Sequence, residues 1–269
     1  DGTRFVVASN HVGTAGSTSH RISGTTPEQW LISSGDSNYA RKYRTSNNEL
    51  IMTNQIRLSD YCLSLVNKFT YSDTWVYSTN SYTSPTSYTE SIWFKTTIAG
   101  GGPLISFEQS QTADSSTHIN EIWMGTNGKI YAGTFDSDRR RVVSLTTYND
   151  GLWHHALATG TNNGNLELFI DNVSQGTYAL GTMYVGTHYW KVGGVNGTEL
   201  LNGLKRNFEG SLAEADVYHR VLTGAEITNL FNHTKPSNTT SWVLSYTLNE
   251  SSGTVITDTS GASNTGTLY

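Results

Sequence analysis

The stretches WHHALAT, at Trp153–Thr159, and LELFID, at Leu166–Asp171, decide how this fold is read. Each is a short run rich in apolar residues, and a Gly/Asn-rich connection separates them, which is the pattern of two β-strands. Asp171 and Asn172 close the second run and favour a tight turn into a further strand. The two stretches therefore predict neighbouring strands with short connections.

Similar runs recur about every 8–12 residues from Glu49 onward. Asn127 and Gly128 join two of them, and this pair predicts a hairpin with a type I′ turn, which needs two residues of positive φ. Strands at this spacing, with Gly, Asn or Asp between them, indicate a β-sandwich or barrel. The other runs are ELIMT, YCLSLV, TWVYST, YTESIWFKT, PLISFE, NEIWMG, KIYAGTF, RVVSL, YWKVGG and FEGSLAEADVYH.

One stretch, TGAEITNLFN at residues 223–232, predicts a helix. Thr223 followed three residues later by Glu226 is a capping box. Ile227, Leu230 and Phe231 then form one apolar stripe. A helix of about ten residues is not stable alone in water, so we expect it to pack against the sandwich.

The composition excludes several classes of protein. Charged residues make up 14% of the chain and the net charge is −5, and Arg139–Arg141 is the main basic cluster, so no basic face for nucleic acid is expected. No apolar stretch approaches the roughly 20 residues of a membrane span. The single cysteine, Cys62, excludes an intramolecular disulfide and is expected to be a small buried side chain. Low charge and many Thr and Asn residues favour an extracellular setting.

Five stretches between Phe69 and Asn232 resemble, in order, the strands and closing helix of the laminin-G-like, concanavalin A-like jelly roll of bacterial extracellular proteins. The resemblance implies an all-β, two-sheet antiparallel jelly-roll sandwich with one short helix near 223–232. It also implies that Trp93 and Trp153 anchor the core. The five stretches are SYTESIWFKTT, GGPLISFEQSQT, YNDGLWHHALAT, NLELFIDNVSQG and FEGSLAEADVYHRVLTGAEITNLF.

This resemblance divides the chain into three parts. Residues 1–45 have few apolar runs and form an arm or added strands. Residues 46–232 form the laminin-G-like jelly roll. Residues 233–269 form a C-terminal strand segment that completes this sandwich or a neighbouring one.

The C-terminal segment resembles a part that normally comes first in the family, where its strand pairs beside the strand matched here by Phe208–His219. Three explanations remain open. The chain is circularly permuted and the segment returns to its own sheet, or the segment fills that place in a neighbouring molecule, or the chain is one repeat of an array. Exchange between molecules would use the same strand hydrogen bonds and propagate as a filament. The apolar run RFVVA at Arg4–Ala8 is a second strand that could be donated.

Catalysis is not expected. Enzymatic relatives of the jelly roll, the β-glucanases, carry a Glu-x-Asp-x-x-Glu strand, and the similar stretch here has Glu214 and Asp216 but His219 in the last position. Two carboxyl groups are needed for glycoside hydrolysis, so we predict no active site. His154 and His155 are neighbours on a predicted strand and point to opposite faces, so they are not expected to share a metal ion.

Two kinds of binding site are expected from the resemblance. One is a calcium site, for which Asp258 and Asn264 are the best candidates, although an Asx-type turn explains the same residues; Asp136 and Asp138 are the second choice. The other is a glycan site made of aromatic side chains on loops. Its candidates are Trp75, Tyr77, Tyr82, Tyr184, Tyr189 and Trp190.

The sequence thus predicts a non-catalytic, extracellular or cell-surface β-sandwich module. Its first expected role is surface assembly or adhesion, with self-association of subunits into a filament by exchange of terminal strands. The alternative is a carbohydrate-binding, lectin-like module that recognises surface glycans. A glycanase is the least favoured of the three.

Overall fold

The computed structural model divides the 269-residue chain into two compact units, residues 1–61 and 62–269. It describes the backbone of residues 28–32, 39–46, 49–57 and 63–65. It also describes residues 75–98, 102–113, 118–133, 141–195, 207–250 and 253–269, with side chains except for residues 118–121. Within these residues, no helix is long and apolar enough to cross a bilayer.

The N-terminal unit contains a three-stranded antiparallel sheet. Its strands are β1 (Glu28–Ile32), β2 (Tyr39–Ser46) and β3 (Glu49–Arg57), in that order. The expected boundary between residues 45 and 46 lies inside this sheet, because the pairing of β2 with β3 continues to the pair of Ser46 and Glu49. The boundary between the units follows Tyr61 instead.

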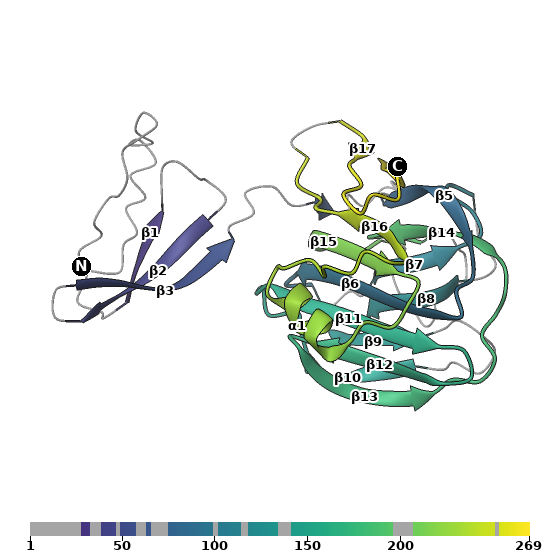
Figure 1. Cartoon of the computed structure of the whole chain (residues 1–269), viewed down its shortest axis with the longest axis horizontal. Helices are drawn as coiled ribbons and strands as arrows, with labels where there is room; N and C mark the ends of the chain where they lie inside the picture. The colour runs from purple at the N-terminus through teal and green to yellow at the C-terminus, as the bar shows by residue number, and fades with distance from the viewer. Residues whose placement is uncertain are drawn as a thin grey trace. The chain divides into compact units, whose positions relative to one another are not determined.

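The second unit is a sandwich of two antiparallel sheets (Figure 1), which confirms the predicted fold class. The eight-stranded sheet has the order β10 (Arg141–Thr147), β9 (Lys129–Gly133), β8 (His118–Met124), β7 (Gly102–Glu108), β14 (Thr187–Val192), β5 (Val76–Thr83), β18 (Gly266–Leu268), β17 (Val255–Ile256). The seven-stranded sheet has the order β13 (Val173–Ala179), β12 (Asn165–Ile170), β11 (His154–Thr161), β6 (Ser87–Lys95), β15 (Gly210–Tyr218), β16 (Trp242–Tyr246), and β4 (Leu63–Leu65) also pairs with β15.

The hydrophobic core lies between the two sheets. Alternation along β6 directs Ile92 and Phe94 inward, where they are fully buried, and Phe107 and Trp190 approach from the opposite sheet. The two predicted tryptophan anchors are not part of this core. Trp93 and Trp153 are half-buried, and Trp93 lies on the outer face of the seven-stranded sheet because its neighbours in the strand point inward.

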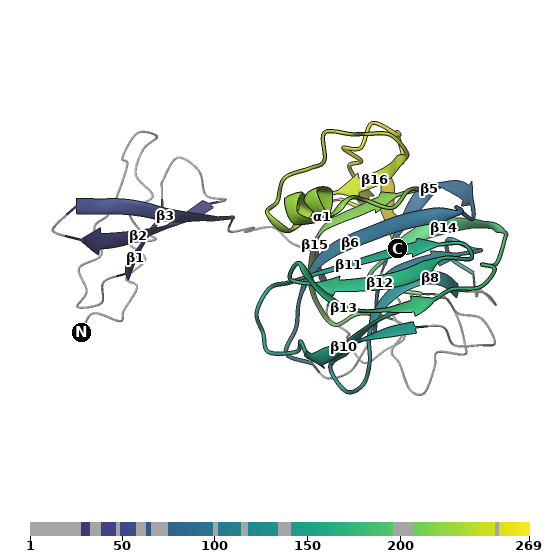
Figure 2. The same ribbon diagram turned by 60° about the horizontal axis from the view of Figure 1, so that its bottom comes forward.

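The single helix of the described residues, α1 (Gly224–Phe231), covers the outer face of the seven-stranded sheet (Figures 1 and 2). Thr223 and Glu226 form the capping box that the sequence predicts. Ile227 and Leu230 are buried in a second apolar cluster with three residues of the sheet and its following loop. Those three residues are Leu157, Tyr218 and Leu222.

Residues 242–269, which are called the C-terminal segment from here on, join both sheets of their own chain. β16 pairs with β15, where Leu244 lies opposite Val217. β18 pairs with β5 in the other sheet, so the last residue lies beside Trp75, directly before β5. There the Tyr269 N–H donates to the Trp75 carbonyl at 2.8 Å and the two rings stack with centroids 4.7 Å apart.

Candidate functional site

The structure separates the six aromatic candidates for a glycan site. Trp75 and Trp190 are fully buried, so the expectation that these two rings contact a ligand at the surface is wrong. The Trp75 indole N–H donates to the carbonyl of Gln111 at 3.0 Å, and its ring packs against Tyr269. Trp190 stacks on Phe107 in the core at 4.4 Å.

The four tyrosines have different surroundings. Tyr82 is half-buried against the core, where its ring meets the His219 ring edge-on at 5.2 Å. Burial, followed by the nearby charge of Asp258, raises the Tyr82 pKa despite a hydrogen bond with Asn80 that lowers it. Tyr184 is 45% exposed on the loop before β14. Tyr77 and Tyr189 remain as half-buried rings on the sandwich surface.

Tyr77 and Tyr189 lie on the outer face of the eight-stranded sheet. Val76 and Ser78 are fully buried on the inner side of β5, so Tyr77 between them points outward. Trp190 is likewise buried on the inner side of β14, so its neighbour Tyr189 points outward. β14, β5 and β18 are consecutive strands of this sheet. Both tyrosines therefore belong to one face.

Threonine hydroxyls extend this face across β18. Thr267 pairs directly with Tyr77 and so shares its face. The exposed Thr79 hydroxyl donates to the Thr265 carbonyl at 2.8 Å, with the two hydroxyl oxygens 3.2 Å apart. We call these five side chains the tyrosine–threonine strip: Tyr77, Thr79, Tyr189, Thr265 and Thr267.

Asp258 and Asn264 organise the loop between β17 and β18. The Oδ1 of Asp258 accepts from the backbone N–H groups of Ser245 and Ser260 at 2.9 and 3.0 Å. Its Oδ2 accepts from the Ser260 hydroxyl at 2.9 Å and the Asn264 N–H at 2.8 Å. The Oδ1 of buried Asn264 accepts from the Asn80 N–H at 2.9 Å.

These contacts form an Asx-turn network, the other explanation for Asp258 and Asn264, and a calcium site here remains a prediction. Among the side chains that the structure describes, no group of three or more His, Cys, Asp or Glu residues is arranged to hold a metal ion. Asp136 and Asp138, the second pair of calcium candidates, lie outside the described residues, as does Cys62.

Glu214 and Asp216 lie on the outer face of the seven-stranded sheet, beneath the loop that follows α1. We call this loop, residues 232–241, the strap. Glu214 Oε2 lies 3.1 Å from His233 Nδ1, and Asp216 Oδ2 accepts from Lys235 Nζ at 2.5 Å. The Asp216 side chain is 1% exposed, and burial raises its pKa even though Lys235 opposes that effect. Asp216 thus forms an ion pair with Lys235 and Glu214 contacts the His233 ring, so neither carboxylate faces solvent.

The residue in the place of the second glucanase glutamate does not join this pair. His219 lies among the aromatic rings of Tyr82 and Trp190, where burial lowers its pKa to about 4. It is therefore neutral at physiological pH. The arrangement contains no carboxylic acid at this position.

The two adjacent histidines have separate environments, as their alternation along β11 predicts. His154 Nδ1 and Nε2 lie 2.8 Å from Asp171 and 3.0 Å from Asp150. His155 Nε2 lies 2.7 Å from the Ser91 hydroxyl under the strap, and burial lowers its pKa to about 3. The outward-facing Trp93 stacks with His233 of the strap at 4.6 Å.

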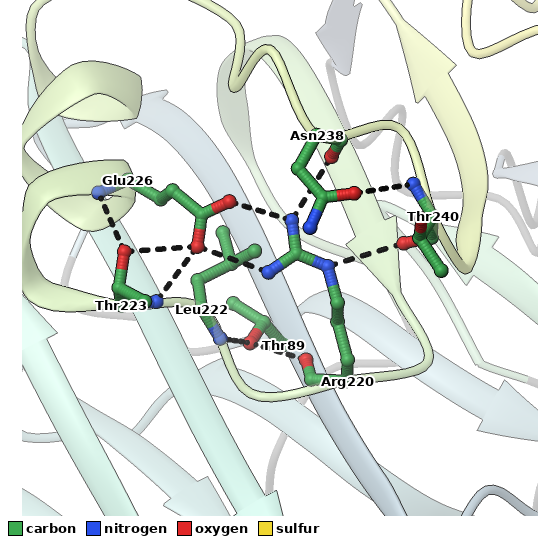
Figure 3. Close-up of polar contacts among 7 residues, drawn as sticks. All are labelled: Thr89, Arg220, Leu222, Thr223, Glu226, Asn238 and Thr240. Atoms are coloured by element: carbon green, nitrogen blue, oxygen red, sulfur yellow. Dashed lines mark hydrogen bonds and ion pairs between the residues drawn. The ribbon is translucent and has the colours of Figure 1, made fainter.

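The polar network that Figure 3 shows around Arg220 was not predicted from the sequence. Its guanidinium forms a bidentate ion pair with Glu226, at 2.9 and 2.7 Å, and donates to the carbonyls of Asn238 and Thr240 at 3.0 and 3.1 Å. Arg220 therefore joins the N-terminus of α1 to the strap. A lone arginine six residues before a capping glutamate carries no motif, so only the tertiary structure shows this link.

A family model described as the concanavalin A-like lectin/glucanases superfamily matches residues 69–228. Among solved structures, the heptameric SAP-like pentraxin from Limulus polyphemus has a TM-score of 0.53 and 14% identity, with 76% of this chain and 94% of that chain covered. A putative carbohydrate binding protein from Bacteroides ovatus has a TM-score of 0.50 and 13% identity, with 90% and 67% covered. No curated protein matches the sequence.

Proposed function

Because the chain belongs to the concanavalin A-like lectin/glucanases superfamily, we propose that its sandwich is a non-catalytic carbohydrate-binding module of an extracellular or cell-surface protein. The structurally similar Bacteroides ovatus protein is described as a putative carbohydrate binding protein, which supports this class of ligand. At 13% identity this similarity shows only the fold, so the argument for binding depends on the surface of this chain.

The environment of Glu214 and Asp216 supports a binding role over hydrolysis. A retaining glycosidase needs two carboxyl groups about 5–5.5 Å apart on either side of the scissile bond. Here His233 and Lys235 of the strap occupy the outward side of both carboxylates. A substrate would have to displace His233 and Lys235 before it reached either group.

The tyrosine–threonine strip is the observation that carries the proposal. Tyrosine rings pack against the apolar faces of sugars and threonine hydroxyls exchange hydrogen bonds with sugar hydroxyls. The strip combines both on the regular surface of three paired strands, which holds the side chains at fixed spacings. Its five members carry no charge, so the proposed ligand class is a neutral glycan.

A glycan array with the full chain tests this proposal, followed by titration of the strongest neutral ligand. Tyr77→Ala and Tyr189→Ala should each weaken binding about ten-fold or more, because each removes a stacking surface. Tyr178→Ala is the matched control, since Tyr178 is 40% exposed on β13 of the other sheet. Thermal unfolding of all three variants shows whether weaker binding comes from the loss of a contact with the glycan or from a less stable fold.

Two outcomes would contradict the proposal. One is an array without a neutral-glycan ligand, both with calcium and with a chelator. The other is a ligand whose affinity is unchanged in both strip variants. The two calcium conditions also test whether binding needs the ion that the resemblance implied.

A further inference from the structure

The C-terminal segment contributes a complete and separable part of the sandwich. β16 supplies one edge of the seven-stranded sheet and β18 pairs with β5 in the other sheet. Its apolar side chains fill the core between the sheets; they are Val243, Leu244, Tyr246, Leu248 and Ile256, each at most 4% exposed. Without the segment, both sheets would have an open strand edge and the core an open side.

The strap that precedes the segment is fixed to its own sandwich. His233 and Lys235 pair with the carboxylates of β15, and Arg220 holds the carbonyls of Asn238 and Thr240 (Figure 3). These contacts all precede β16 in the sequence. They stay in place if only the residues after Thr240 move.

A tight turn connects the fixed strap to the segment. The Trp242 N–H donates to the Thr239 carbonyl at 3.2 Å, and Ser241 between them has φ +59°. A non-glycine residue in this left-handed region costs roughly 1–2 kcal/mol. Extending the turn would remove this strain and release β16. It would also break two hydrogen bonds at the turn. One is the bond from the Trp242 N–H, and the other runs from the His219 N–H to the Ser241 carbonyl at 2.8 Å.

We propose that the turn at Thr239–Trp242 is a hinge and that the C-terminal segment of one molecule completes the sandwich of a second copy of this chain. Beyond the hinge, every contact of the segment is remade with identical residues, which makes such exchange a route to association at low energetic cost. The exchange does not depend on glycan binding. It would nevertheless place Thr265 and Thr267 of one copy in the tyrosine–threonine strip of the other.

Substitutions at the hinge test the proposal in the full chain by light scattering after size-exclusion chromatography. Ser241→Pro excludes positive φ and should shift the chain toward reciprocal dimers or longer open chains that retain the β-sheet circular dichroism spectrum. Ser241→Gly relieves the strain in the closed form and should weaken dimerisation about five-fold per hinge, or roughly 25-fold for two hinges. Ser241→Ala keeps the strain and serves as the control.

A complementation experiment shows whether the segment itself is exchanged. Val217→Asp damages the acceptor strand and Leu244→Asp damages the donated strand, at two residues that face each other across β15 and β16. Neither full-length variant should form a stable sandwich alone. When the two variants are refolded together, a heterodimer has one sandwich made of the two undamaged parts and one made of the two damaged parts. The mixture should therefore recover up to about half of the protease-resistant material that the wild-type chain yields. Val255→Asp, in the same segment but 61% exposed, should fold alone.

The proposal is overturned if Ser241→Pro remains a folded monomer, or if it loses its fold without gaining any associated form. It is equally overturned if the Asp variants show no recovery when refolded together. A failure of glycan binding would leave both readouts unchanged, so this proposal and the function proposed above fail separately.

Discussion

At the scale of single residues, His154 and His155 should respond to pH in opposite directions. Burial lowers the pKa of His155 to about 3, so the unfolded chain binds a proton more readily, and stability should fall as the pH drops from about 6.5 toward 3. The contribution of His155 to the free energy of unfolding should fall by roughly 1 kcal/mol for each pH unit in this range. Urea unfolding of His155→Gln between pH 4 and 7 should show a flatter dependence than wild type.

His154 is the internal control for this prediction. Burial alone would lower its pKa, but hydrogen bonds to Asp171 and Asp150 raise it above the ordinary value. Its contribution is therefore present below pH 6.5 and is lost as the pH rises through the folded-state pKa. His154→Gln should cost more stability at pH 6 than at pH 8.5. Equal costs at the two pH values would contradict the assigned ion pairs.

A second prediction at this scale concerns the packing at Gly160. A Cβ atom there would lie 2.3 Å from the Tyr88 ring, which is fully buried in the core. Gly160→Ala should lower the free energy of unfolding by about 1–3 kcal/mol, because the ring cannot move within a filled core. Gly224→Ala at the start of α1 meets no atom within 4 Å and should stabilise by ~0.5–1 kcal/mol. Denaturant titrations of both variants compare the two sites.

Sequence reasoning was least accurate for individual side chains. Asn127–Gly128 has the stronger hairpin signal, yet only Gly128 of that pair has positive φ, whereas Asp171 and Asn172 both adopt positive φ. Trp75 and Trp190 lie in runs that also read as strands, and they are buried by the C-terminal residue and by Phe107. Such outcomes depend on contacts between distant parts of the chain. Local composition does not encode them.

At the scale of secondary structure elements, the start of α1 depends on one carboxylate with several roles. Glu226 closes the capping box and pairs with Arg220, whose hydrogen bonds lower the Glu226 pKa to about 2. Glu226→Gln should cost about 1–2 kcal/mol at pH 7. Because the contribution is present above pH 4.5 and lost as the pH falls toward 2, the cost should shrink at pH 3. Urea unfolding at pH 7 and pH 3 measures the stability that Glu226→Gln loses, and Glu167→Gln on β12 is the control.

The elements themselves were largely predictable. The strand spacing and the capping box indicated the sandwich strands and α1, because alternation and capping are local patterns that the tertiary structure preserves. The strap was not recognised as an element that covers carboxylates. His233 and Lys235 acquire that role only because β15 places Glu214 and Asp216 beneath them.

At the scale of the whole molecule, the sequence placed the first of its two boundaries between residues 45 and 46, whereas the compact units of the structure meet after Tyr61. Residues 1–45 differ in composition from the rest, and composition was the available signal. The structural division follows pairing instead, which keeps β3 with β2 in the N-terminal unit and gives β4 to the sandwich. A composition shift cannot show which sheet a strand joins.

This division leads to a prediction about truncated chains. Residues 62–269 contain both sheets and the whole described core, so this fragment should fold alone with an unfolding midpoint within a few degrees of the full chain. Residues 75–269 also lack β4, which pairs with β15 at Gly210–Leu212. Loss of β4 leaves that edge unpaired, so this shorter fragment should unfold about 1–3 kcal/mol more easily and associate more readily. Thermal unfolding and light scattering compare the fragments with the full chain.

A fragment 62–269 that does not fold would show that the sandwich needs the N-terminal unit. Equal stability of the two fragments would show that β4 contributes nothing to the edge of β15.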